Sequence, residues 1–377
     1  MQSIRVAQLF DGKQWLSDQI VDWQQGEITA IGSGAGSELP LHHGFLTAGF
    51  TDLQVNGGGG VLVNATPNAA AIWQMLLTHA QFGTTAMLPT VITDSLAVMT
   101  AAADAVAALH RQHPDNIVGI HFEGPHISYA KKGAHNADFI RPISDAEWQL
   151  YGRDDLGVKL VTVAPETVSP AEVTRLTELG CKVFVGHSDA SFAQAQAALN
   201  AGAVGFTHLY NAMSALGSRA PGMVGAALLD DASVCGLIVD GHHSDFGACQ
   251  LAIKTKGYQQ IALVTDAMPP VGVDQQQFTL VNKTVYRQGD KLVAESGELA
   301  GSALDMASAV RNCVQQLKLP LSQALAMATA VPATVLGLTP RLGQLGVGKA
   351  ANMVLLDDNL EVVDCWLAGQ ALARLRS

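Results

Sequence analysis

The stretch KVFVGHSDASFAQAQAALNAGAVGFTH (182–208) decides the fold, because it holds two strand-like runs with a helix-like segment between them. Residues 182–187 and 204–208 are short apolar runs that each end in histidine, and residues 192–201 are rich in alanine with the spacing of a helix. Strand, helix and strand in succession are typical of a parallel sheet. The stretch therefore predicts a βαβ unit with a histidine at the end of each strand.

The same alternation continues along most of the chain. Eight strand-like runs lie between residues 46 and 268, and alanine-rich segments such as 68–82 and 94–113 separate most of them. Eight units favour a closed (β/α)₈ barrel, a TIM barrel, over an open α/β sheet. The predicted strands are Leu46–Gln54, Thr84–Thr90, Ile117–Glu123, Val158–Ala164, Lys182–His187, Val204–His208, Val234–Asp240 and Gln260–Asp266.

The two ends of the chain have a different pattern. Residues 1–45 and 341–377 contain short alternating segments that are separated by turns, as is typical of antiparallel strands. We expect both ends to meet in one small β-sandwich beside the barrel, which would span residues 46–340. The segment Gln277–Val293 predicts a hairpin that is inserted after the last barrel strand.

Composition narrows the function. Of 377 residues, 48% are hydrophobic and 15% are charged, and the mean hydropathy is +0.21. These values fit a large core with strands that are buried on both faces. The formal net charge of −11 argues against binding to nucleic acid or to an anionic membrane surface.

Targeting and redox signals are weak. No apolar stretch reaches the roughly 18 residues of a membrane helix, and residues 1–6 lack the features of a secretion signal. We therefore expect a cytoplasmic protein. The five cysteines contain no Cys-x-x-Cys pair, which argues against a disulfide framework or a thiolate metal site.

Four side chains with catalytic chemistry stand at the ends of predicted strands. They are Glu123, His187, His208 and Asp266. One carboxylate and two imidazoles suffice to hold a divalent metal with an open coordination position, although a histidine at a strand end can also be a structural donor. Asp266 would then move protons to and from a metal-bound water, and its alternative role is that of a helix N-cap.

Further candidates lie in loops that follow these strands. His135 and His243 offer imidazoles for sugar hydroxyls or an acyl oxygen. Arg219 follows Asn211 and Ala212, whose amide and main-chain donors suit a phosphate. For each of these loop residues the alternative is a side chain that is simply solvated.

Several motifs together resemble one family. The chain is similar to the N-acetylglucosamine-6-phosphate deacetylase family of the amidohydrolase superfamily over nearly its whole length. The motifs that carry the resemblance are HFEGP (121–125), KGAH (132–135), GHS (186–188), THLYNAM (207–213), DGHH (240–243), VTDAM (264–268) and LAGS (299–302).

The resemblance implies a homodimeric barrel enzyme that acts on a phosphorylated amino sugar. It would remove the N-acetyl group of N-acetyl-D-glucosamine 6-phosphate, giving D-glucosamine 6-phosphate and acetate. Glu123, His187 and His208 would hold the metal, a metal-bound hydroxide would attack, and Asp266 would be the general base and acid.

The resemblance also assigns the substrate contacts. His135 and His243 would contact sugar or acyl oxygens, and we expect His135 to help stabilise the oxyanion. Asn211, Ala212 and Arg219 would bind the substrate, with Arg219 reaching the phosphate from its own or from the neighbouring subunit.

One departure from the wider superfamily bears on the number of metals. Many members carry His-x-His at the end of the first strand and build a two-metal site, whereas this chain has Gln54-Val55-Asn56. An amide binds a divalent ion far less well than an imidazole does. We therefore predict one ion per subunit, Zn²⁺ or Fe²⁺ with Mn²⁺ or Co²⁺ also compatible, and a Gln54 side chain that bonds to bound water or substrate.

Two other functions stay open at this point. The first is the same reaction on a related amino sugar, namely the galactosamine epimer or a sugar without phosphate. The second is a barrel without catalysis that serves as a binding module.

Overall fold

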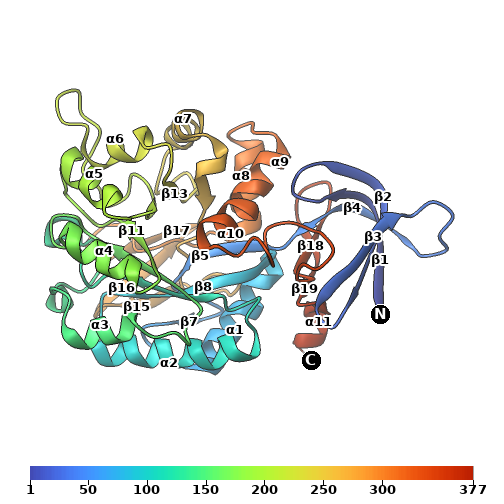
Figure 1. The fold of residues 1–377 in the computed structure, drawn as a ribbon, viewed down its shortest axis with the longest axis horizontal. Coiled ribbons are helices and arrows are strands. Elements are labelled where there is room, and N and C mark those ends of the chain that lie inside the picture. Colours follow the sequence, from blue (N-terminus) through green and yellow to red (C-terminus); the bar gives the residue numbers. More distant parts are fainter. Residues whose placement is uncertain (377) are drawn as a thin grey trace.

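A computed structural model describes residues 1–376, and its largest part is the barrel (Figure 1). Within this range, eight strands pair side by side in the order β14-β13-β12-β11-β10-β9-β8-β5, and all seven pairs are parallel. A parallel bridge between Val55 and Ala267 joins the first strand to the last. The predicted TIM barrel is therefore confirmed. Its strands are β5 (Phe50–Val55), β8 (Thr84–Ile92), β9 (Gly119–Glu123), β10 (Val158–Val163), β11 (Cys181–Val185), β12 (Gly205–Phe206), β13 (Val234–Leu237) and β14 (Ile261–Leu263).

Helices surround the barrel strands, as Figure 1 shows. Local sequence explains where several of them begin. The side chains of Ser169 and Ser191 each accept a hydrogen bond from the main-chain N–H three residues further on. The side chain at that later position accepts one from the serine's own N–H, which completes a capping box in each case. These helices are α1 (Ala69–His79), α2 (Leu96–Gln112), α3 (Asp145–Tyr151), α4 (Pro170–Glu178), α5 (Phe192–Asn200), α6 (Gly222–Leu229), α7 (Phe246–Lys256), α8 (Met306–Gln315), α9 (Leu321–Ala328) and α10 (Ala330–Leu336). A short helix near the C-terminus, α11 (Leu372–Leu375), lies away from the barrel strands.

The first predicted strand, Leu46–Gln54, was wrong as one element. The chain leaves a strand of the end sheet, β4 (Leu41–Ala48), and enters β5 after Gly49. A Cβ atom at Gly49 would lie 2.1 Å from the hydroxyl of Thr85, so the backbone passes β8 too closely for any other residue. Periodicity alone does not reveal this change of sheet.

Both ends of the chain meet in a separate mixed sheet, as predicted. Within residues 1–376 it has seven strands, and a compact apolar core that includes Trp23, Leu46, Met353 and Trp366 lies against it. Figure 1 shows the N- and C-termini on this side of the molecule. In spatial order the strands are β20 (Gln370–Ala371), β19 (Val362–Leu367), β18 (Met353–Leu356), β4, β1 (Gln2–Phe10), β2 (Trp15–Gln24) and β3 (Glu27–Ser33).

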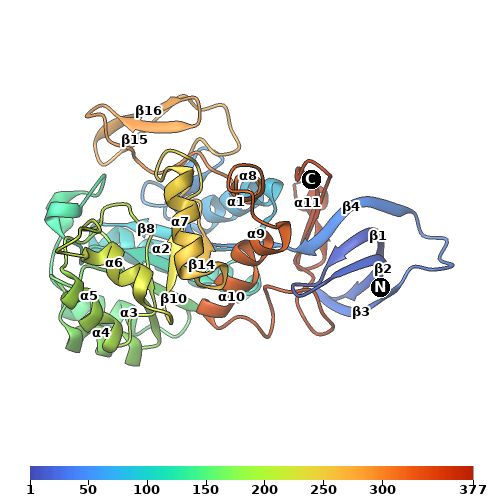
Figure 2. The same cartoon turned by 90° about the horizontal axis from the view of Figure 1, so that it is seen from above.

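The predicted hairpin is present and has a third strand. The strands β15 (Gln277–Leu280), β16 (Lys283–Gln288) and β17 (Lys291–Ala294) form an antiparallel sheet that projects from the barrel (Figure 2). Its inner side chains share an apolar cluster with Ile92 and Met268 of the barrel. The hairpin is therefore packed onto the barrel instead of hanging free.

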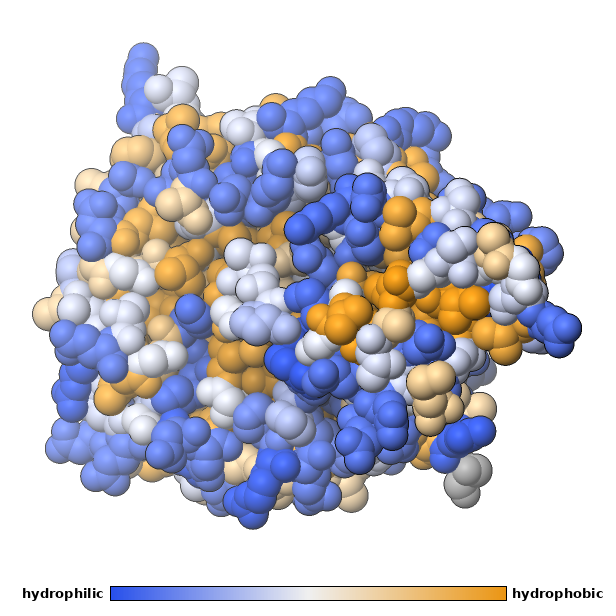
Figure 3. Space-filling view, turned by 45° about the vertical axis from the view of Figure 1, so that its right-hand side comes forward, coloured by the Kyte–Doolittle hydropathy of each residue, from blue (hydrophilic) through white to orange (hydrophobic). Residues whose placement is uncertain are grey.

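The surface contains both apolar and hydrophilic side chains. On the face shown in Figure 3, apolar groups gather in a band across the middle and hydrophilic groups cover most of the periphery. Among the described residues, none of the helices combines the length and apolar character required to cross a membrane.

Candidate metal centre and active site

The four predicted strand-end residues all lie at the same mouth of the barrel. Glu123 is the last residue of β9, and His187, His208 and Asp266 follow β11, β12 and β14 within three residues. Parallel strands bring their carboxyl ends to one rim, which explains the convergence. The φ angles of His187 (47°), His208 (31°) and Asp266 (51°) are left-handed, a conformation that costs about 1–3 kcal/mol and persists only where the surroundings enforce it.

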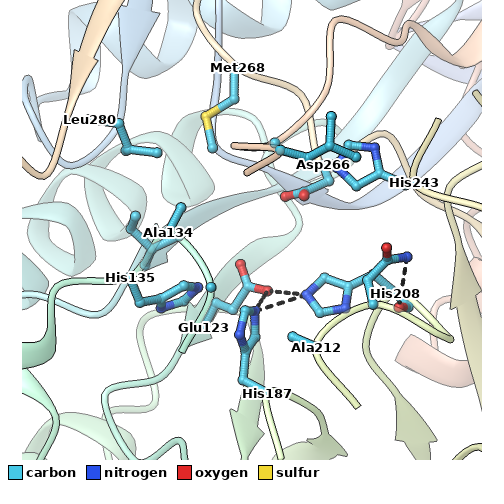
Figure 4. Close-up of a pocket in the computed structure, with 15 residues that line it drawn as sticks. Glu123, Ala134, His135, His187, His208, Ala212, His243, Asp266, Met268 and Leu280 are labelled. Carbon is cyan, nitrogen blue, oxygen red and sulfur yellow. Dashed lines mark hydrogen bonds and ion pairs between the residues drawn. The ribbon is translucent and has the colours of Figure 1, made fainter. Parts of the chain in front are cut away.

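Three of these side chains touch one another (Figure 4). Oε1 of Glu123 lies 3.0 Å from Nε2 of His208 and 3.3 Å from Nε2 of His187. The two Nε2 atoms are 3.0 Å apart. All three side chains are at most 7% exposed.

This donor set fits a divalent ion. Ligand atoms about 2.0–2.1 Å from a tetrahedral metal lie about 3.3 Å from one another, close to the three distances above. Nδ1 of His187 lies 2.9 Å from the carbonyl oxygen of Lys131. If Nδ1 donates its proton there, Nε2 keeps a lone pair for a metal, the arrangement usual for ligating histidines.

Glu123 and His208 stabilise each other's charged forms. Burial opposes ionisation of Glu123, but hydrogen bonds from His187 and His208 outweigh it and hold the pKa of Glu123 well below its usual range. Burial acts against protonation of His208, yet its hydrogen bond to Glu123 raises the pKa of His208. A proton and a metal cation therefore compete for Nε2 of His208.

His135 is a fourth member of the cluster. One ligand atom each from Glu123, His135 and His187 lies within 4.8 Å of the others, so geometry alone would also allow this trio to hold a metal. Nδ1 of His135 lies 2.8 Å from the hydroxyl oxygen of Thr93 and 3.4 Å from the main-chain N–H of Thr93, which can only donate. Burial holds the pKa of His135 well below its ordinary value. If Nδ1 accepts from both groups of Thr93, the neutral ring carries its proton on Nε2, where it is a donor and not a metal ligand.

Asp266 lies across the pocket from this cluster (Figure 4). Its Oδ1 accepts hydrogen bonds from Nδ2 of Asn56 at 2.6 Å and from Nε2 of Gln54 at 3.0 Å. Nε2 of Gln54 also donates to Oε1 of Glu123 at 2.9 Å, so one amide links both carboxylates. The loss of hydration on burial, followed by the charge of Glu123, raises the pKa of Asp266 to about 6. Such a value suits a group that must both accept and release a proton near neutral pH.

His243 lines the same pocket and is held from behind. Its Nδ1 lies 2.7 Å from Oδ2 of Asp240, and Oδ1 of Asp240 accepts the N–H groups of His242 and His243 at 2.8 Å each. Burial opposes ionisation of Asp240, but the His243 hydrogen bond outweighs it and lowers the pKa of Asp240. The ring of His243 thus presents Nε2 to the pocket.

The pocket between these groups has a volume of about 170 Å³. Asn211 and Ala212, which the sequence analysis assigned to substrate binding, form part of its wall. Another part is apolar and comes partly from the hairpin, a contribution that the sequence did not predict. The apolar lining residues are Ile92, Ala134, Met268, Leu280 and Leu299.

Arg219 is not part of this pocket. Its side chain is exposed on the loop before α6, and within residues 1–376 the pocket lining contains neither lysine nor arginine. The structure thus brings together all predicted site residues except Arg219, since Gln54 reaches the site through its bonds to Glu123 and Asp266.

Asn56 and Asp52 were missed by the sequence reasoning. Both lie on β5 or just beyond it, at alternate positions with Gln54. Polar residues that recur every second position in a strand share one face. In a strand that is otherwise apolar and buried, this pattern was the available signal.

Comparison with known proteins defines the class. A family model described as "Amidohydrolase family" matches residues 45–372, and the chain belongs to this family. The N-acetylgalactosamine-6-phosphate deacetylase of Shewanella sp. (strain ANA-3) is 49% identical over 358 residues, 95% of this chain and 90% of that protein. The N-acetylglucosamine-6-phosphate deacetylase of Haemophilus influenzae is 34% identical over 335 residues, 88% of this chain and 87% of that protein.

A solved structure is similar over almost the full length. The crystal structure of N-acetylglucosamine-6-phosphate deacetylase from Pasteurella multocida matches with a TM-score of 0.94 and 34% identity, covering 98% of this chain and 99% of that one. Its overall fold is therefore closely similar to the present fold.

Proposed function

We propose that this protein is a metal-dependent deacetylase of N-acetylhexosamine 6-phosphates, which converts N-acetyl-D-glucosamine 6-phosphate and water into D-glucosamine 6-phosphate and acetate. The observation that carries the proposal is the contact between Glu123, His187 and His208 at one rim, with Asp266 across the pocket. Relatives named for this activity at 34–35% identity support it.

One divalent ion would be held by Glu123, His187 and His208. Zn²⁺ and Fe²⁺ suit one carboxylate and two imidazoles, as do Mn²⁺ and Co²⁺. When bound, such an ion lowers the pKa of water and polarises a carbonyl oxygen. The amide of Gln54 stands where many superfamily members have a metal-ligating histidine, which supports a single ion.

Asp266 moves the proton in this proposal. Its carboxylate accepts a proton as water adds to the acetamide carbon. It then donates that proton to the nitrogen as the carbon–nitrogen bond breaks, so that the amine leaves without a negative charge. Asn56 and Gln54 both donate to Oδ1 of Asp266, which leaves its Oδ2 for this exchange.

His135 stabilises the developing negative charge on the acetyl oxygen. Its neutral ring directs an Nε2–H into the pocket, and a fixed donor aimed at such an oxygen typically speeds acyl transfer by about 10²–10³-fold. Beside it lie the apolar side chains of Ala134, Met268 and Leu280, which provide a surface for the acetyl methyl group (Figure 4).

The sugar and phosphate lie toward Asn211, Ala212 and His243 in this proposal. The lining of the pocket lacks a lysine or arginine within the described residues, and Arg219 is exposed on a loop outside it. We therefore infer a homodimer in which Arg219 of one subunit reaches the phosphate bound by the other. A phosphate of charge near −2 is poorly held without such a cation.

The galactosamine epimer is the second candidate substrate. A specific observation favours it, because a relative named for N-acetylgalactosamine 6-phosphate is 49% identical, against 34–35% for relatives named for the glucosamine compound. Both sugars carry the same scissile amide and the same phosphate. The proposed chemistry is therefore common to both, and only the ratio of kcat/KM separates them.

Acetate release decides between these possibilities. The purified protein is assayed with both 6-phosphates and with both sugars lacking phosphate, and its metal content is measured in the same sample. We expect turnover of at least one 6-phosphate and a large loss of kcat/KM without the phosphate. No acetate from any of the four would overturn the proposal in favour of a binding module.

The redox state of the cysteines bears on location. All five are buried and unpaired within the described range. Unpaired cysteines are usual in reducing compartments, and we propose a cytoplasmic location on this ground. Fractionation of the source cells tests it.

A further inference from the structure

A buried carboxylate that the proposed reaction does not use lies behind Asp266. Asp52, in the middle of β5, is fully buried. Its Oδ2 accepts the hydroxyl of Thr265 at 2.5 Å, and its Oδ1 accepts the main-chain N–H groups of Gln54 at 3.1 Å and of Thr265 at 3.3 Å. Carboxylates are seldom buried completely unless they are paired.

Asp52 stands at the seam where the barrel closes. The ladder of β14 ends at Leu263, and beyond it the first and last strands are joined by the N–H of Asp266, which donates to the carbonyl oxygen of Gln54 at 3.0 Å. The carboxylate of Asp52 spans the same seam one step deeper, with a donor on each strand. Asp52 thus bonds to two residues next to the proposed proton-transfer group: Thr265 precedes Asp266 in the chain, and Gln54 donates a hydrogen bond to Asp266.

The segment around Asp266 is held from its other side as well. Ser302 donates its hydroxyl to the carbonyl oxygen of Thr265 at 2.5 Å and its N–H to the carbonyl oxygen of Asp266 at 2.9 Å. Asp266 lies between these two anchors at a φ of 51°, where residues other than glycine are strained. If either anchor is released, the backbone of Asp266 can relax to an ordinary conformation.

We propose that Asp52 is a positioning residue for the proton transfer. Through the hydroxyl of Thr265 and the N–H of Gln54, it fixes the carboxylate of Asp266 relative to the metal cluster. The inference rests on the proposed function, because Asp266 acts on substrate only in that reaction. It assigns a catalytic consequence to a residue that touches neither metal nor substrate.

A purely structural role for Asp52 would have a different consequence. If Asp52 only closed the barrel, its loss would lower stability without a selective effect on kcat. If it positions Asp266, kcat falls while KM and metal content hold, because binding groups such as His243 lie on loops that follow other strands. Misplacing a catalytic group by about 1 Å typically costs about 10²-fold in rate.

The test removes the hydroxyl and then restores it. Thr265→Val deletes the donor to Asp52 at nearly constant volume, together with the longer bond that the same oxygen accepts from the N–H of Ala267 at 3.3 Å, and Thr265→Ser keeps both. On the 6-phosphate that the wild-type enzyme deacetylates faster, we expect Thr265→Val to lower kcat by about 30-fold or more. We expect KM to stay within about threefold and metal content to stay at the wild-type value. Thr265→Ser should recover most of the lost kcat.

Asp52→Asn is the second test variant, and Thr329→Val is the control for the loss of a buried hydrogen bond. Thr329 is a buried threonine between α9 and α10 whose hydroxyl donates to the carbonyl oxygen of Leu325 at 2.7 Å. Its variant loses one buried hydrogen bond outside the barrel mouth and should keep kcat within about twofold at a lowered Tm. If Asp52→Asn does not fold, the threonine variants still decide the matter.

Two results would overturn the inference while leaving the proposed function intact. One is a Thr265→Val enzyme with kcat within about twofold of wild type. The other is a loss of kcat that only follows Tm and also occurs in Thr329→Val. Absence of wild-type turnover is a separate result, because it removes the proposed function itself.

Discussion

The mouth of the barrel and the end sheet are built on opposite principles. At the mouth, Glu123, Asp266 and Asp52 are carboxylates packed into protein. The core of the end sheet is apolar, and its Arg5–Asp18 ion pair is at the surface. The first region stores unfavourable interactions that the fold must enforce, and the second supplies ordinary favourable packing.

This difference teaches where each kind of substitution should act. Buried charge and strain persist in proteins where they contribute to function, because they lower stability and must be supported by the remaining fold. Changes at the mouth should therefore reduce activity more than stability. Changes in the end sheet should do the reverse.

The largest effect is expected at Asp266. Asp266→Asn keeps the shape of the side chain but cannot exchange a proton, so kcat should fall by about 10²–10⁴-fold. Metal content should be unchanged, since the cation is held by other residues in the proposed site. Acetate release and metal analysis of one preparation check both points, and near-normal turnover would refute the assignment.

The next effect is expected at His135. His135→Ala removes the donor aimed at the acyl oxygen, and kcat should fall by about 10²–10³-fold. A thermal scan should show little loss of stability, because the variant also removes a buried polar group. A change in KM alone would mean that His135 only binds substrate.

The end sheet should respond in the opposite way. Leu46 is completely buried in its core. Leu46→Ala should lower the free energy of unfolding by about 2–5 kcal/mol through lost burial and the cavity left behind. Its kcat at 25 °C should stay within about twofold of wild type. Denaturant titration and steady-state kinetics measure the two, and a large fall in kcat would break the division between the regions.

The last expected effect is a pH dependence of stability in the metal-free protein. The folded-state pKa of Asp266 is about 6, above its ordinary value of 3.8. A raised pKa contributes stability that is complete below about pH 4 and is lost as the pH rises through about 6. The wild type should therefore lose about 3 kcal/mol relative to Asp266→Asn across this window. A constant difference between the two would contradict the raised pKa.

Much of the fold could be predicted because its signals are local and repeated. Continuous apolar strands, alanine-rich helices and strand-end histidines recur along the chain, and the barrel follows from their number. The switch at Gly49 could not be predicted, because it depends on contact with Thr85 in a neighbouring strand. The packing of the hairpin against Ile92 and Met268 is likewise a contact between distant segments.

The site likewise has features that the sequence predicts and features that it does not. The convergence of Glu123, His187 and His208 follows from barrel topology alone. The choice between His135 and His208 as the third ligand does not, because the proton position on His135 depends on Thr93, far away in sequence. The sequence also did not reveal that Arg219 lies outside the pocket, because the path of its loop depends on the folded chain.

Metal content of two histidine variants tests the central claim most directly. Wild type, His208→Ala and His135→Ala are purified in parallel with equal metal supply, and bound metal is measured per chain. With Glu123, His187 and His208 as ligands, we predict about one ion in the wild type and in His135→Ala, and almost none in His208→Ala. Metal lost from His135→Ala but kept by His208→Ala would contradict this ligand set and the roles built on it.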